Sequence, residues 1–275
     1  MTASAVRTAD PALAARYGGA EPPDAAPAND VVGLLYRHRS VRQFAQTPVA
    51  DDVLTTIVAA AQSAATSSHL QSWSVIEVRD PERRARVAQL AGEQAFIRDA
   101  GAFLVFVADL SRNRRIADRR GEPSDGLDFV DSTLTAFVDA GVAAQNAVVA
   151  AESLGLGTAY VGSVRNEADA LADLLGLPEA AFPVVGVAIG YPSAEATTGV
   201  KPRLPQHVVR HVDAYAPASD DDIAAYDRTV AAYYATQGAE RAWTPSVLKR
   251  VRDAASLHGR HELRSALERR GLPSR

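Results

Sequence analysis

Residues 141–151 read GVAAQNAVVAA, and the rest of the chain can be arranged around this stretch. Only Gln145 and Asn146 are polar in it, so a helix formed here contacts other structure on nearly every side. The apolar pattern extends the helix to about residues 127–154, in the alternating steps of four and three that mark a helix packed along its length. The positions of this seam are Val130, Leu134, Phe137, Gly141, Ala144, Val148 and Ala151.

The middle of this helix predicts a partner as well as a core. Gly141 inside a helix costs about 0.5–1 kcal/mol relative to alanine, and close approach of another backbone would compensate. A sheet of the same chain can cover one side of the helix, and a symmetric second copy can cover the other. The seam is too short for an isolated coiled coil. We therefore expect this helix in the core of a homodimer.

Four segments read as strands, and helical stretches alternate with them. Two of these segments, 103–108 and 184–189, are apolar throughout and predict central, buried strands. Segment 74–79 alternates, which predicts a strand with one polar side. The fourth strand is expected at 158–162. Together they indicate an α+β protein with α/β layering.

The glycines around the fourth strand do not form a dinucleotide fingerprint. In GLGTAYVGSVRN, residues 155–166, the glycines follow a helix and lead into a strand, which is the wrong order for a Rossmann phosphate loop. Gly162 and Ser163 are better placed at the end of the strand. A missing side chain there would let the backbone approach a flat ligand.

Two basic segments lie far apart in the sequence. RHRSVRQF, residues 37–44, follows an apolar run, where a bend from helix to extended chain can aim several donors at one anion. On this octapeptide alone a solvated basic turn explains the charges. In KPRLP, residues 201–205, two prolines hold the chain extended and place Lys201 and Arg203 on one side. The two segments together suggest the two sides of one anion site.

Two polar positions between these segments have ordinary alternatives. ATSSHLQ, residues 65–71, places Thr66, Ser67 and Ser68 in a row, as a serine-rich loop or as compact donors beside a phosphate. Gln94, in the helical stretch between the first two strands, is either a surface glutamine or a ligand-facing one.

Composition limits the class of protein. The chain has 275 residues, 47% of them hydrophobic, and a net charge of −4 with both signs spread along it. These values predict a soluble globular protein with no overall field for nucleic acid or an anionic membrane. Cysteine is absent, which excludes disulfides and thiolate chemistry and fits a cytoplasmic protein. No leader or bilayer-length apolar run is evident, so neither secretion nor membrane anchoring is expected.

Three regions are expected from the distribution of residues. Residues 1–29 are rich in Ala and Pro and predict a flexible tail. Residues 30–215 form the core, and residues 216–275 form a helical extension that packs on the core or on a partner subunit. Val247, Leu248, Val251, Leu263 and Leu267 are its expected apolar anchors.

Other catalytic constellations are poorly supported. His207 and His211, and likewise His258 and His261, have helical metal-ligand spacing, but neither pair has a carboxylate third ligand in reach, so no metal site is expected. The sequence contains no GxSxG elbow and no GxxxxGK[ST] loop.

HRSVRQF, ATSSHLQ, AAESLGLGTAYVGSVRN (residues 150–166) and KPRLP together resemble the flavin-dependent nitroreductases, within them the larger NADPH-linked group of oxygen-insensitive nitroreductases and flavin reductases. The resemblance covers about residue 30 to the C-terminus. It implies a central mixed sheet flanked by helices around a long buried helix, and a homodimer with FMN at each subunit interface. The implied reaction is ping-pong hydride transfer from NADPH, or alternatively NADH, to nitroaromatics, quinones or flavins.

The resemblance also assigns site residues, with the flavin rather than a side chain carrying the catalysis. His38, Arg39 and Arg203 would hold the phosphate, and Arg42 and Lys201 would lie near the ring. The remaining implied cofactor residues are Ser40, Ser67, Ser68, Gln94, Gly162 and Ser163.

The coenzyme site departs from the pattern. Relatives that prefer NADPH carry arginines just after a tyrosine-rich helix, where this chain has Gln237, a shorter loop at 238–243, and Arg241 beside Glu240. A glutamine supplies no charge and a carboxylate opposes a second phosphate. We expect NADPH use with a reduced advantage over NADH, carried by Arg241.

Two further interpretations stay open. One is another enzyme of the same fold, such as a flavin reductase, a reductive dehalogenase or a flavin-fragmenting enzyme. The other is a non-catalytic protein that binds flavin or an anion.

Overall fold

The structure of the chain, a computed structural model, describes residues 10–18, 22–23 and 28–272. The chain forms two compact units: Met1–Arg39 with Thr197–Ser256, and Ser40–Ala196 with Leu257–Arg275. We refer to them as the smaller and the larger unit. Most of the expected tail, residues 1–29, lies outside the described residues, and the divisions expected at residues 30 and 216 stay predictions.

The larger unit is built on a four-stranded sheet of order β1-β2-β4-β3. Its strands are β1 (Trp73–Glu77), β2 (Ala102–Asp109), β3 (Gly157–Val161) and β4 (Ala181–Gly190). β2 and β4 lie in the centre and are buried almost throughout, as their apolar sequences predict.

The predicted mixed sheet is wrong for the residues that the structure describes. All three strand pairings are antiparallel, and the parallel component is one isolated bridge, Ser40 to Thr158. Alternation of strands and helices along the sequence does not fix strand direction. The direction of a strand depends on the end of the sheet at which the preceding connection enters it.

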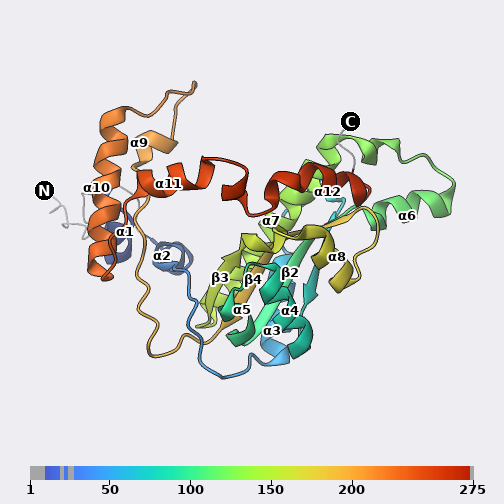
Figure 1. Ribbon diagram of the computed structural model, residues 1–275, viewed down its shortest axis with the longest axis horizontal. Helices are drawn as coiled ribbons and strands as arrows, with labels where there is room; N and C mark the ends of the chain where they lie inside the picture. The colour runs from blue at the N-terminus through green and yellow to red at the C-terminus, as the bar shows by residue number, and fades with distance from the viewer. Residues whose placement is uncertain (1–9, 19–21, 24–27, 273–275) are drawn as a thin grey trace, which may run out of the picture. The chain divides into compact units, whose positions relative to one another are not determined.

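Helices cover both faces of this sheet (Figure 1). Successive β2 side chains point to opposite faces, so Leu104 and Phe106 join one core cluster and Phe103 and Val105 join the other. The first cluster is closed by α3 (Asp51–Gln62) and α7 (Val130–Ser153). The second is closed by α4 (Pro81–Leu90), α5 (Ala95–Asp99) and α8 (Ala168–Leu175).

The long helix is confirmed as α7, but its buried face differs from the predicted seam. The sheet-facing side consists mainly of alanines, whereas Val130 and Leu134 of the seam are exposed. Periodicity marks a repeating stripe but does not tell which of two apolar stripes faces the sheet. The buried residues are Thr133, Ala136, Asp139, Ala140, Ala143, Ala144, Ala147, Val148 and Ala151.

The two polar residues of the central stretch have partners. Asn146 donates from Nδ2 to the carbonyl of Ala60 in α3, at 3.1 Å. Gln145 accepts from the Tyr160 hydroxyl on β3, at 3.2 Å. Burial and the charge of Glu152 raise the pKa of Tyr160 to about 12, so this hydroxyl stays a donor at neutral pH. These bonds tie α7 to its neighbours on two sides.

α7 also has the length and composition of a membrane span, with 24 residues and a mean hydropathy of 1.4 in its most apolar window. A core helix of a soluble protein passes the same test. Here one side of α7 packs on the sheet and includes the buried carboxylate of Asp139, so we interpret it as a core helix.

The C-terminal residues belong to both units. α12 (Leu263–Arg269) joins the larger unit, where Leu263 and Leu267 pack on the core. Leu248 and Val251 of α11 (Trp243–Val251) are exposed, so they are not anchors within the described chain. The spacing of apolar residues identified the helices but not which of them had a surface to cover.

The secondary structure described in the smaller unit is helical, with extended segments between the helices. Its helices are α1 (Pro11–Arg16), α2 (Asp30–Arg37), α9 (Gln206–Val209), α10 (Asp220–Thr236) and α11. α10 begins with a capping box between Ser219 and Asp222. α1 lies where the composition predicts no packed face. It forms because Asp10 caps it and Leu13 is buried.

Candidate functional site

The residues expected to bind cofactor and coenzyme divide between the two units. The smaller unit contains six of them: His38, Arg39, Lys201, Arg203, Gln237 and Arg241. The larger unit contains Ser40, Arg42, Ser67, Ser68, Gln94, Gly162 and Ser163. Each group is described within its own unit.

In the smaller unit, tyrosines of α10 hold the extended segment before and through KPRLP. The Tyr226 hydroxyl donates to the carbonyl of Pro202, and the Tyr233 hydroxyl donates to the carbonyl of Gly199, both at 3.1 Å. Burial raises the pKa of both tyrosines, which keeps these hydroxyls protonated as donors. The tyrosine-rich helix therefore acts as a support that fixes the backbone of Lys201 and Arg203.

Two predicted cations meet at a third tyrosine. The ammonium of Lys201 lies 5.6 Å from the ring centroid of Tyr234, and the guanidinium of Arg241 lies 5.7 Å from the same centroid. Both distances suit cation–π attraction, worth about 0.5–1 kcal/mol at exposed sites. Tyr234 therefore positions one residue predicted for the flavin ring and one predicted for the coenzyme.

Arg241 also lines a groove between α10 and α11. The groove has a volume of about 420 Å³, an alanine floor and a charged rim that includes Glu240 and Lys249. Gln237 is not among its lining residues; its amide donates to the Thr236 hydroxyl at 3.3 Å. Lys249 was missed by sequence reasoning. Lys249 lies seven residues after Ala242, which also lines the groove, and residues seven apart share one face of a helix.

In the larger unit, the strand-like segment after α2 is fixed by steric fit. The Val41 N–H donates to the carbonyl of Thr158 at 2.8 Å, and Val41 is buried. A Cβ on Gly157 would lie 2.7 Å from the Val41 Cβ, so only glycine allows this approach. Because side chains alternate along extended chain, Ser40 and Arg42 are directed away from Val41.

Arg42 extends from this segment to α5. Its guanidinium lies 5.7 Å from the ring centroid of Phe96. Gln94 is the residue that precedes α5, and its amide donates to the carbonyl of Gly92 at 3.2 Å. The structure thus brings the surroundings of Arg42 and Gln94 together through one short helix.

Gly162 and Ser163 begin a 3-10 turn, Gly162–Arg165, directly after β3. A Cβ on Gly162 would meet only the Arg165 guanidinium at 3.5 Å, an ordinary contact. Among the described residues, nothing therefore requires glycine there, and the predicted approach of a flat ligand stays a prediction.

The serine loop, residues 66–71, has an unusual backbone. Ser68, His69 and Gln71 have φ values of 48°, 56° and 51°. Non-glycine residues in this left-handed region cost on the order of 1 kcal/mol or more each, and such strain concentrates at binding and active sites. The conformation must be held by other contacts.

Asp139 of α7 supplies the main contacts. It is 2% exposed, and its Oδ2 accepts from the Thr66 hydroxyl at 2.6 Å while its Oδ1 accepts from the Ser67 N–H at 3.1 Å. The Thr66 hydroxyl in turn accepts from the Gln71 N–H at 2.9 Å. One buried carboxylate therefore sets both ends of the loop. Sequence reasoning missed Asp139, although an aspartate inside an apolar helical stretch was a signal.

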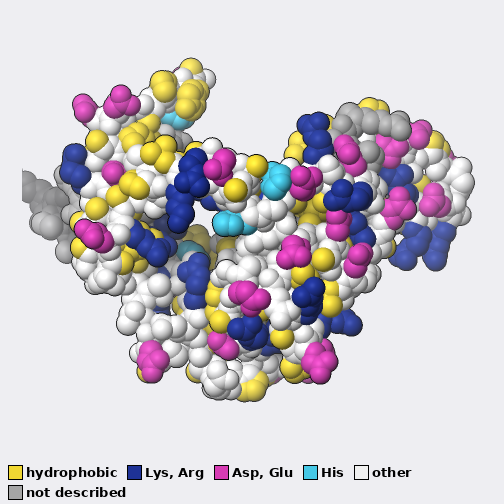
Figure 2. Space-filling model, viewed as in Figure 1, with side chains coloured by type: hydrophobic (Ala, Val, Ile, Leu, Met, Phe, Trp, Pro, Cys, Tyr) yellow, Lys and Arg dark blue, Asp and Glu magenta, His cyan; other side chains and the backbone are white. Residues whose placement is uncertain are grey.

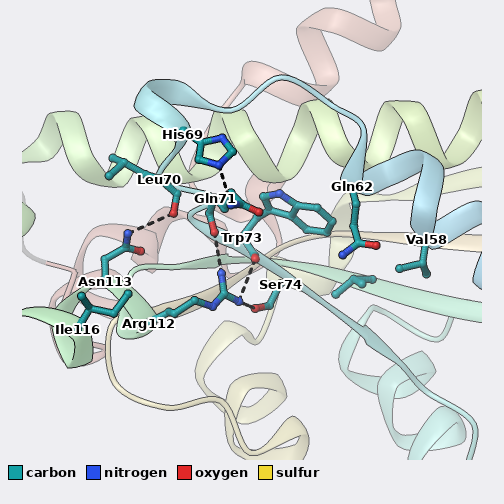
Figure 3. Close-up of a pocket in the computed structure, with 11 residues that line it drawn as sticks. Val58, Gln62, His69, Leu70, Gln71, Trp73, Ser74, Arg112, Asn113 and Ile116 are labelled. Atoms are coloured by element: carbon teal, nitrogen blue, oxygen red, sulfur yellow. Dashed lines mark hydrogen bonds between the residues drawn. The ribbon is translucent and has the colours of Figure 1, made fainter. Parts of the chain in front are cut away.

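A cavity of about 570 Å³ opens beside this loop (Figure 3). Arg112 holds the loop from the far side, donating to the carbonyl of Gln71 at 2.7 Å and to the Ser74 hydroxyl at 2.9 Å. Asn113 donates to the carbonyl of Leu70 at 3.2 Å. With Trp73 also in the lining, the cavity combines an aromatic surface with fixed polar groups. Such a site suits a planar molecule with polar substituents.

Arg112 is itself oriented by Asp109, at 3.5 Å. Burial acts to raise the pKa of Asp109, but hydrogen bonds from Ser111 and Ser74 and the charge of Arg112 outweigh it and lower the pKa. A depressed pKa means that Asp109 stabilises the fold at neutral pH. That contribution is lost as the pH falls below the unfolded value of about 3.9 and through the folded pKa.

Three of the four histidines noted for metal-like spacing make other contacts. His207 pairs with Asp222 at 2.7 Å, His261 pairs with Glu262 at 3.3 Å, and the His211 ring packs edge-on against Tyr215. Within residues 10–18, 22–23 and 28–272, no group of three or more His, Asp or Glu residues is arranged to hold a metal ion.

Comparison with known proteins accounts for nearly the whole chain. The model described as "Nitroreductase family" matches residues 35–191, and "Nitroreductase family, C-terminal domain" matches residues 201–275. An NADPH-flavin oxidoreductase of Vibrio harveyi is 42% identical over 76% of this chain and 84% of its own length. An FMN reductase (NADPH) of Bacillus subtilis is 37% identical over 80% and 90%. The crystal structure of nitroreductase A from Vibrio parahaemolyticus has a TM-score of 0.83 and 36% identity, covering 90% of this chain and 100% of that one.

We predict that Asp139→Asn destabilises the protein by about 1–3 kcal/mol, because the asparagine side chain can accept from only one of the two donors that Asp139 satisfies. The free energy of unfolding in urea measures this loss, and hydrogen exchange of a peptide spanning residues 66–71 locates it. Asp131→Asn, at an exposed position of the same helix, is the control. Equal stability of the two variants would contradict the role of Asp139.

Proposed function

The chain belongs to the nitroreductase family and is an FMN-dependent NADPH oxidoreductase, and we propose the residues and the assembly through which it acts. The observation that carries the proposal is the match of both family models to a chain in which His38, Arg39, Lys201 and Arg203 belong to one unit. When bound, FMN accepts a hydride from the nicotinamide and passes the electrons to an acceptor. The protein binds and orients the partners.

His38, Arg39 and Arg203 bind the flavin phosphate in this proposal. His38 directly follows α2, where the chain turns from helix to extended structure, and Arg39 and Arg203 are exposed. Guanidinium groups fit phosphate through paired, charge-assisted hydrogen bonds, and each such bond contributes about 1.5–3 kcal/mol. The tyrosine supports of the 199–203 segment favour a fixed, ligand-ready backbone.

Arg42 and Lys201 lie near the flavin ring in this proposal, where a cation stabilises the reduced ring more than the oxidised ring. Gln94 contacts the ring from beside Arg42, and Gly162 and Ser163 approach it with their backbone. Further hydrogen bonds to the flavin come from Ser40, Ser67 and Ser68. The left-handed backbone of the serine loop supports a binding role, because strain of this kind is retained where a site needs it.

The acceptors are small molecules of the nitroaromatic, quinone or flavin classes. We assign them to the cavity beside the serine loop, whose volume of about 570 Å³ lies within the usual range for ligand sites. Trp73 and Leu70 offer surfaces for an aromatic ring, and Arg112 offers donors for a nitro or carbonyl oxygen.

We also propose a homodimer, located in the cytoplasm, whose subunits meet along α7. Val130, Leu134, Val138 and Val142 form an exposed stripe at intervals of four on the side of α7 away from the sheet. No described atom lies within 4 Å of the Cβ that an alanine at Gly141 would carry, which favours a second copy as the source of the close approach expected there. Large apolar side chains rarely remain uncovered in such a row.

For the coenzyme, we propose that Arg241 reads the 2′-phosphate and that Lys249 is the second cation of the same groove. Both line the space between α10 and α11, with Glu240 on the rim. Glu240 opposes a second phosphate, which limits the advantage of NADPH over NADH. Gln237 can add a neutral hydrogen bond.

The phosphate assignment predicts that Arg39→Ala weakens FMN about thirtyfold, the effect of losing a charge-assisted contact of about 2 kcal/mol. Fluorescence titration of apoprotein with FMN measures the dissociation constant. Arg37→Ala removes the same charge two residues earlier from another exposed side chain. Its affinity should change much less, and equal losses in the two variants would mean that only net charge matters.

The coenzyme assignment predicts that Arg241→Ala and Lys249→Ala each lower kcat/KM for NADPH by roughly tenfold and leave kcat/KM for NADH nearly unchanged, because only NADPH carries the 2′-phosphate. Steady-state kinetics with both coenzymes gives the ratio. An NADPH preference that survives both substitutions would show that the phosphate is read elsewhere.

The dimer assignment predicts that Val138→Glu yields monomers, because the substitution would bury an unpaired carboxylate in the interface at a cost of several kcal/mol. Val138 is 62% exposed, and Val212→Glu, at a position 73% exposed, is the control. Sedimentation velocity separates the two states. A dimeric Val138→Glu variant would place the interface on another surface.

A further inference from the structure

Arg16 connects the two basic segments that the sequence suggested were sides of one anion site. It is the last residue of α1, outside the residues matched by either family model. Its side chain extends away from its own helix, to residues 20, 22 and 185 positions later in the chain. α1 therefore contacts segments that follow it only much later in the sequence.

The contacts of Arg16 involve backbone atoms of both segments. Its Nη2 donates to the carbonyls of Tyr36 and His38 at 2.8 and 2.6 Å, and its Nη1 donates to the carbonyl of Lys201 at 3.1 Å. Its own carbonyl accepts from the Arg203 N–H at 2.8 Å. One residue thereby links the turn that carries His38 and Arg39 to the extended segment that carries Lys201 and Arg203.

The residues around Arg16 are held in place by packing and by a helix cap. Asp10 caps α1 by accepting from the Ala12 N–H at 2.8 Å, and Leu13, three residues before Arg16, is buried. Gly18, just after the helix, has a φ of 67°, and a Cβ there would overlap the methyl group of Thr229 in α10. The chain around Arg16 is therefore packed against α10, the helix whose tyrosines hold the same extended segment.

The guanidinium suits this position because of its shape and its charge. Its planar fork can donate to several carbonyls at once, which a lysine ammonium on a flexible stem does less well. It also adds a positive charge beside backbone that bears His38, Arg39, Lys201 and Arg203. These hydrogen bonds of the Arg16 guanidinium go to backbone carbonyls, so they hold the two segments without using the side chains of Arg39 and Arg203.

We propose that Arg16 is a positioning residue for the phosphate of the flavin: it fixes the backbones of residues 36–38 and 201–203, so that His38, Arg39 and Arg203 are held ready for one anion. This inference rests on the phosphate assignment proposed above. In this proposal α1 braces the cofactor site: it holds the backbone of the residues that bind the phosphate.

The test compares full-length variants by two measurements, the dissociation constant of FMN and hydrogen exchange of a peptide spanning residues 199–204. Arg16→Ala should weaken FMN about tenfold, equivalent to about 1.4 kcal/mol, and should speed exchange in this peptide. Arg115→Ala should change neither; Arg115 is an exposed arginine of α6 (Ser111–Arg120), over which basic side chains gather in Figure 2. Exchange of peptides from the sheet should match the parent in both variants, which excludes general unfolding.

Two further variants separate geometry from charge. Arg16→Lys keeps the charge but loses the fork, so its affinity should remain at least about fivefold below that of the parent. In the Arg203→Ala background, Arg16→Ala should weaken FMN by less than it does alone, because part of the effect of Arg16 is exerted by holding the backbone that carries the Arg203 side chain.

Each result is decisive. If Arg39→Ala weakens FMN and Arg16→Ala stays within about twofold of the parent, the brace is wrong and the phosphate assignment stands. Parental affinity in Arg16→Lys would show that charge alone acts. Parental affinity in both Arg39→Ala and Arg16→Ala would overturn the phosphate assignment and the brace together.

Discussion

The packing of an alanine face of α7 against the sheet is the constraint on which the larger unit depends. Alanines at the contact let the helix backbone lie close to β2 and β4, and the neighbouring helix α3 is tied to it through Asn146. The large apolar side chains of α7 are left on the opposite side, where Leu134 and Val138 are exposed. The small face of this helix therefore makes the contact within the chain, and its large face is the one that the proposed dimer would cover.

The buried face of α7 also carries one ionisable side chain, that of Asp139. Asp139 is buried among the alanines, yet both of its oxygens accept hydrogen bonds from the serine loop. A buried carboxylate without partners would be costly, so the loop and the helix constrain each other. The hydrogen bonds from the loop to Asp139 and from Arg112 to the loop offset the conformational free energy that the strained backbone costs.

The smaller unit relies on a different kind of contact. Only a few of its described apolar side chains are buried, among them Leu13, Tyr226 and Val230. Its extended segments are held mainly through backbone carbonyls, which receive donors from Tyr226, Tyr233 and Arg16. Bonds of this kind fix a backbone without consuming the side chains that it carries, which suits a site built from cations.

The sequence by itself determined the layered α+β class, the four strands within a few residues and the long helix, because periodicity and apolar runs are local properties of a chain. The family followed from motifs in fixed order. Strand direction, the buried face of α7 and the contacts of Arg16 and Asp139 were decided only by the tertiary structure, as was the place of Lys249 in the groove. Each depends on contacts between residues distant in sequence: the guanidinium of Arg16 meets the carbonyl of Lys201 across 185 positions, and Asp139 meets Thr66 across 73. No local pattern encodes such a pair, because the partner's backbone reaches that place only after the whole chain has folded.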